Sequence, residues 1–120
     1  MLRQESNLKI VDNTGVKYAR IIRKLGKNSK KLIVGDLIVV HIINSTPTSS
    51  VKKGDVCKAV IIRTRYPFRR VDGNLIAFSE NAAVLVDNDC NPKGTRIFGP
   101  ILRELKQNFN KIISISSEII

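Results

Sequence analysis

Apolar and polar residues alternate over short segments in the first 86 positions, and turn-forming residues separate these segments. Alternation with a period of two, in stretches rich in Val and Ile, is typical of β-strands that bury one face. The pattern predicts strands over 8–11, 16–25, 37–43, 56–64, 75–78 and 83–86. A helix is the competing interpretation of 16–25, but the β-branched and aromatic residues there, with turn signals on both sides, favour a strand.

Five or six short strands with a turn signal every several residues are typical of a small closed barrel, and not of alternating strands and helices. The turns include Asp12-Asn13-Thr14-Gly15 and Asp72-Gly73, where Asn and Gly accept left-handed backbone conformations. The run 37–43 is nearly continuous in apolar residues, which predicts burial on both faces of that strand. We therefore expect a mainly β fold.

The pattern changes after position 86. Residues 87–94 form a turn-rich loop, and Pro100 suits the first turn of a helix over 101–106 whose apolar side packs on the barrel. Residues 111–114 form either a last helical turn or an edge strand, and the apolar end at 119–120 is expected to dock. We expect one domain over 1–120, with the barrel at about 1–86 and a C-terminal loop and helix at about 87–120.

Composition narrows the functional class. A chain of 120 residues with 42% hydrophobic content closes one core without metals or disulfides. Its net charge of +11 points to a polyanionic partner, either nucleic acid or an anionic membrane. The membrane interpretation fails because no apolar run approaches the length that spans a bilayer.

The positive charge is concentrated in the first part of the chain. Residues 1–70 contain 16 Lys or Arg and 4 Asp or Glu, whereas residues 71–120 contain 5 and 6. One side of the domain is therefore expected to meet a polyanion and the other to serve different contacts.

Catalytic and metal-binding patterns are missing from the sequence. His41, the only histidine, lies within an apolar strand and is more simply a structural residue, and the carboxylates are scattered. Cys57 and Cys90 lack metal-ligand spacing, so we expect two reduced thiols in an intracellular protein, with a disulfide as the open alternative. The amino terminus resembles neither a secretory signal nor a transit peptide. We expect no enzyme activity, metal or cofactor.

RNA binding has better candidates, because long basic side chains in loops and at strand ends reach phosphates without being buried. The predicted RNA-binding residues are Lys30, Lys31, Lys52, Lys53, Arg63, Arg65, Arg69 and Arg70. Tyr66 and Phe68 either stack on an unpaired base or cover the mouth of the barrel. Since aromatic residues make up only 5% of the chain, recognition is expected to be mostly of backbone and shape.

Several motifs resemble one family. The stretch from Ala59 to Leu85, with three aliphatic residues at 60–62, Asp72-Gly73, Phe78 and Asn81, matches the signature of the universal large-subunit ribosomal protein fourteen (L-fourteen) family. The segments 11–15, 51–55 and 94–100 also resemble that family, so that the resemblance covers essentially the whole chain in order.

The resemblance implies a five-stranded barrel with a small C-terminal helical part, located on large-subunit ribosomal RNA (rRNA) at the face that meets the small subunit. It also implies contact with a neighbouring large-subunit protein and an intersubunit bridge to small-subunit rRNA. In the family a ribosome-silencing factor docks on the C-terminal surface. The protein or bridge contacts that we carry over are Thr95, Arg96, Arg103, Lys111 and Ser114.

The sequence departs from the family at Ala77 and Ser79, where a basic and an acidic residue are common, and at the loop tip 66–68. Its 17 Ile and 10 Asn indicate an AT-rich genome. These features resemble organelle-encoded members, with a mitochondrial ribosome favoured over a plastid or an AT-rich bacterium. The rival functions are a small barrel enzyme acting on RNA, which would bring Asp72, Glu80 and His41 into one pocket, and a free RNA chaperone or translation factor.

Overall fold

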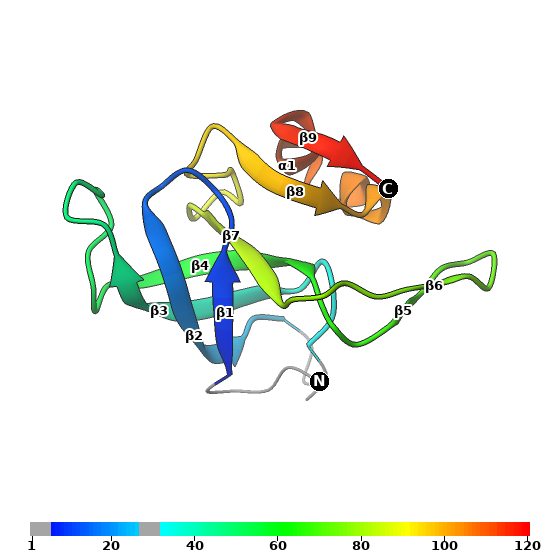
Figure 1. Ribbon diagram of the computed structural model, residues 1–120, viewed down its shortest axis with the longest axis horizontal. Helices are drawn as coiled ribbons and strands as arrows, with labels where there is room; N and C mark the ends of the chain where they lie inside the picture. Colours follow the sequence, from blue (N-terminus) through cyan, green and yellow to red (C-terminus); the bar gives the residue numbers. More distant parts are fainter. Residues whose placement is uncertain (1–5, 27–31) are drawn as a thin grey trace.

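Five strands wind into a closed barrel in the computed structural model, which describes residues 6–26 and 32–120 (Figure 1). The barrel strands are β1 (Asn7–Ile10), β2 (Val16–Lys24), β3 (Leu37–Ser45), β4 (Val56–Arg63) and β7 (Ala82–Val86). Each pairs with the next in antiparallel orientation, and a parallel pairing of β1 with β7 closes the barrel. The expectation of a mainly β fold built on a five-stranded barrel is confirmed.

The barrel interior is filled by one side of each strand, as period-two alternation requires. Leu8, Ile21, Ile38, Ile61 and Leu85 are among the inward residues, each at most 1% exposed. Over residues 37–43, the strand β3 buries every second residue and leaves the residues between them only half-buried. The prediction that 37–43 is buried on both faces is therefore wrong, because no element in the described part of the chain packs a full layer over that side.

A second core joins the barrel to the C-terminal part, which consists of β8 (Ile97–Ile101), the 3-10 helix η1 (Arg103–Gln107), α1 (Asn110–Ser114) and β9 (Ser116–Ile119). Outward residues of β4 and β7, such as Val60 and Val84, pack in this core with Leu102, Leu105 and Ile112. The strand buried on both faces is therefore β7, whose residues are all buried. Figure 1 shows the C-terminal elements gathered on one side of the barrel.

The helix predicted over 101–106 is wrong in position. Pro100 lies within β8, which pairs in parallel with β9, and helical structure begins only at Arg103. Residues 111–114 are helical, which resolves the choice between a helical turn and an edge strand. The apolar end docks through its main chain, because the Ile120 amide donates to the Ile101 carbonyl at 2.8 Å while the side chains of Ile119 and Ile120 are 50% and 42% exposed.

Between β4 and β7 the chain forms a narrow ribbon, the arm, made of β5 (Phe68–Arg69) and β6 (Leu75–Ile76). Figure 1 shows the arm projecting away from the barrel. The strand predicted over 75–78 is shorter than expected and ends at Ile76.

Cys57 and Cys90 are free, so the alternative of a disulfide between them is not realised. Within residues 6–26 and 32–120, neither helical segment has the length and apolar character needed to cross a bilayer.

Candidate nucleic-acid interface

The turn before β4 presents the first two basic candidates. The Lys52 amide donates to Asp55 Oδ2 at 2.9 Å, and Gly54 has a φ of +91°, a conformation that glycine adopts without steric cost. Lys52 Nζ donates to the Pro47 carbonyl at 3.0 Å, and Lys53 is exposed with no partner among the described residues. The rigid turn therefore holds both ammonium groups at the surface, as the sequence predicts.

The arm presents Arg69. Its Asp72-Gly73 turn is closed by the Asn74 amide, which donates to Asp72 Oδ1 at 3.0 Å, and by the Arg70 amide, which donates to the Asn74 carbonyl at 2.9 Å. Arg69 is exposed, and no partner is seen for its side chain in the described part of the chain. The arm, which projects away from the barrel (Figure 1), thus carries an exposed guanidinium.

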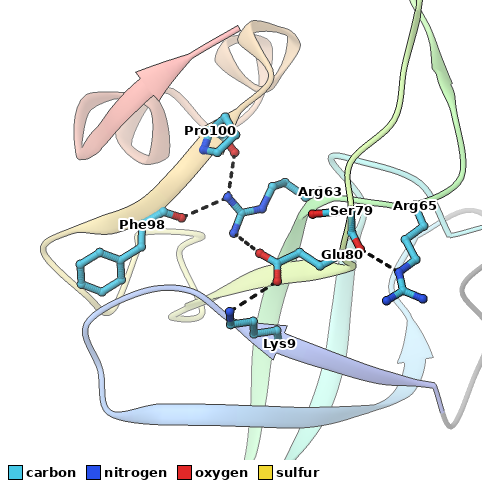
Figure 2. Close-up of polar contacts among 7 residues, drawn as sticks. All are labelled: Lys9, Arg63, Arg65, Ser79, Glu80, Phe98 and Pro100. Atoms are coloured by element: carbon cyan, nitrogen blue, oxygen red, sulfur yellow. Dashed lines mark hydrogen bonds and ion pairs between the residues drawn. The ribbon is translucent and has the colours of Figure 1, made fainter.

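Arg65 lies at the base of the arm and is exposed. Its amide donates to Asn81 Oδ1 at 2.8 Å. Its Nε donates to the Ser79 carbonyl at 2.9 Å (Figure 2). This single side-chain bond orients the guanidinium and leaves its terminal nitrogens for a phosphate.

The two aromatic candidates differ, because Tyr66 is 50% exposed whereas Phe68 packs against the second core.

Arg63 does not have the exposure that the sequence suggested. Its side chain is 5% exposed and lies between the barrel and β8, where Nη1 donates to the carbonyls of Phe98 at 3.2 Å and Pro100 at 3.3 Å (Figure 2). Nη2 pairs with Glu80 Oε1 at 3.0 Å, and Glu80 also pairs with Lys9 at 3.4 Å. The prediction of a surface guanidinium is therefore wrong, because residues far along the chain cover this end of β4.

The environment of Arg63 is tightly built. Burial lowers the pKa of its guanidinium, and the Glu80 carboxylate offsets part of that shift. Gly99 has a φ of +84°, and a Cβ on it would overlap Arg63 Nη1. The missing side chain at Gly99 is therefore what lets the guanidinium reach the β8 carbonyls, which makes Arg63 a tie between the barrel and the C-terminal part.

Arg70 is also engaged within the protein. Its Nε donates to Glu104 Oε2 at 3.0 Å, its Nη2 donates to the main-chain oxygen of Ile120, and its side chain is 11% exposed. The expectation of an unburied Arg70 is wrong for the same reason as for Arg63. The remaining two candidates, Lys30 and Lys31, lie outside the described residues.

The C-terminal candidates are all exposed and come from two places, the loop before β8 and the helical segments: they are Thr95, Arg96, Arg103, Lys111 and Ser114. Lys111 and Ser114 share the short helix α1, where Ser114 Oγ donates to the Lys111 carbonyl at 2.7 Å.

Asn13 positions part of this surface and was missed by the sequence analysis. Its Oδ1 accepts from the amides of Thr95 at 2.8 Å and Arg96 at 3.3 Å, and its Nδ2 donates to Thr95 Oγ1 at 2.7 Å. A Cβ on Gly94 would lie 2.6 Å from Asn13 Oδ1, so this glycine permits the approach. The only sequence signal was that Asn13 belongs to a turn motif, which does not reveal a contact 82 positions away.

The pocket that an RNA-processing enzyme would need is not assembled. Glu80 is paired with Arg63 and Lys9, Asp72 accepts from Asn74 within its own turn, and His41 lies on the outer side of β3. Among residues 6–26 and 32–120, no group of three or more His, Cys, Asp or Glu is placed to hold a metal ion.

Comparison with protein families gives one match that spans the chain. The family model described as Ribosomal protein L14p/L23e matches residues 1–120.

Proposed function

The chain belongs to the ribosomal protein L14p/L23e family, and from this premise we propose that it binds large-subunit rRNA through exposed lysines and arginines of its barrel. As a member of this family it is a structural constituent of the large ribosomal subunit, and the family is structural rather than catalytic. The observation that carries the proposal is the exposure of Lys52, Lys53, Arg65 and Arg69 on rigid turns and strand ends. Long cations held in this way suit phosphate contacts that do not require burial.

The C-terminal surface is proposed to make the protein contacts and the intersubunit bridge. Thr95, Arg96 and Lys111 are exposed there. They belong to residues 71–120, which carry no excess of positive charge. A neighbouring large-subunit protein, small-subunit rRNA and a ribosome-silencing factor are the partners that this surface would take. The departures from the family pattern at Ala77, Ser79 and 66–68 support an organellar ribosome, with the mitochondrion favoured, whereas the AT-rich composition fits an organelle and an AT-rich bacterium equally well. The location of the gene in an organellar genome would test that assignment.

Sedimentation tests the main proposal. A tagged copy expressed in its own organism should travel with large subunits through a sucrose gradient at moderate salt. A free RNA chaperone or translation factor would instead remain near the top of the gradient. Recovery of the protein mostly off ribosomes would overturn the ribosomal proposal.

A further inference from the structure

One outer side of the barrel is left uncovered by residues 6–26 and 32–120. The second core draws on β4 and β7 and includes no residue of β2. On the opposite side, outward residues of β2, β3 and the first half of β4 are exposed or half-exposed. We call this surface the open face, and it consists of Tyr18, Arg20, Arg23, His41, Val56 and Lys58.

The strand pairing places these residues side by side. Arg20 lies opposite His41, which in turn lies opposite Val56, and this gives one row across three strands. In the next row Arg23 and Lys58 lie on either side of Val39. Neighbouring strands are about 4.8 Å apart, so the basic groups of the two rows form one surface rather than isolated charges.

The charge of the open face is of one sign. Its cationic side chains are Arg20, Arg23 and Lys58, and none of its six residues is acidic. Arg23 and Lys58 have no partner among the described residues, and Arg20 makes one bond, at 3.3 Å, to Asn7. Uncompensated cations on the outer surface of a sheet complement a phosphate backbone, whereas the core of a protein–protein interface is depleted of charge.

The face also exposes a flat aromatic group. Tyr18 is 47% exposed and Val56 is 64% exposed, although both belong to strands that are otherwise well packed. An exposed ring among cations on a sheet is the arrangement on which an unpaired base stacks while its flanking phosphates are neutralised.

We propose that the open face is an RNA-contact surface, on which Tyr18 stacks on an unpaired base and Arg20, Arg23 and Lys58 bind the neighbouring phosphates. This inference rests on the proposed rRNA binding and adds a surface on the strands to the loop and arm residues. The sequence analysis placed these residues on strands and did not name them as RNA ligands.

The test compares two full-length variants that lose the same charge. The first carries Arg20→Gln, Arg23→Gln and Lys58→Gln. The control carries Lys93→Gln, Lys106→Gln and Gln107→Glu in the C-terminal part, all of which are exposed and lie outside the contact residues named above. Affinity for a large-subunit rRNA transcript of the same organism is measured by filter binding over a series of KCl concentrations, after circular dichroism has shown that both variants fold.

The open-face variant should lower the slope of log K against log salt by about two to three, since each phosphate contact contributes about 0.7–0.9. The control should keep the slope of the parent protein. Tyr18→Ala should weaken binding roughly tenfold or more, and Tyr18→Phe should restore it.

Equal slopes for the two triple variants would overturn the inference and point to a protein as the occupant of the face. Unchanged affinity of Tyr18→Ala would overturn it as well. If the parent protein itself did not bind the rRNA transcript, the proposed function would fail. That outcome is distinguishable from a failure of the open-face inference, in which the parent protein binds and the variants do not differ.

Discussion

Replacement of Arg63 by Met tests whether this residue is a structural tie, because Met keeps much of the side-chain volume and removes the charge and all donors. The variant loses the bonds to the Phe98 and Pro100 carbonyls and the ion pair with Glu80. Breaking a buried ion pair by removing one partner costs about 3–5 kcal/mol. Two features make the expected loss of stability smaller than this range. The Glu80 side chain is 35% exposed, so its carboxylate can be hydrated again, and Arg63 Nε has no hydrogen-bond partner to lose.

We therefore expect Arg63→Met to lower the free energy of unfolding by about 2–4 kcal/mol. For a domain of this size, that corresponds to a fall of roughly 8–16 °C in Tm. Urea denaturation followed by circular dichroism gives the first quantity, and calorimetry gives the second. Arg65→Met is the matched control, because that exposed side chain makes a single bond to Ser79 and its loss should cost less than about 1 kcal/mol.

Two results would refute the reasoning. If Arg63→Met were as stable as Arg65→Met, the network between the barrel and β8 would not hold the two parts together. If Arg63→Met kept its stability and lowered the salt slope of rRNA binding by about one, the residue would be a phosphate ligand after all.

Three further outcomes are expected. Gly99→Ala should destabilise the protein by at least about 2 kcal/mol in urea denaturation, whereas Gly73→Ala, with the same left-handed backbone but open space around it, should cost about 1 kcal/mol. Asn13→Ala should cost about 1–2 kcal/mol and weaken subunit association in light scattering, and Asn13→Asp, which keeps the acceptor oxygen, should lose less of both. Arg69→Gln should lower the salt slope of rRNA binding by about one at unchanged Tm, whereas Arg70→Gln should lower Tm instead, and the reverse pattern would contradict the placement of both residues.

The candidate site could be predicted in part. Local rules were sufficient for Lys52 and Lys53, which lie in a short surface turn. They were also sufficient for Arg69, which alternates along the arm with the half-buried Phe68 and Arg70. The same rules failed for Arg63 and Arg70, which look equivalent in the sequence. Their partners on β8 and η1 lie more than 30 positions away, and only the docking of the C-terminal part brings them into contact.

Local patterns in the chain were enough to predict the strands of the barrel, most of its turns, the excess of positive charge in the first 70 residues and the family. Period-two alternation and turn chemistry act between near neighbours, so they are readable without a structure. The tertiary structure decided which outer side of the barrel is covered. The C-terminal part buries β4 and β7 and leaves β2 and β3 open, and this choice depends on contacts between remote segments, such as Asn13 with Thr95. It therefore also decided which arginines became structural ties and which remain available to RNA.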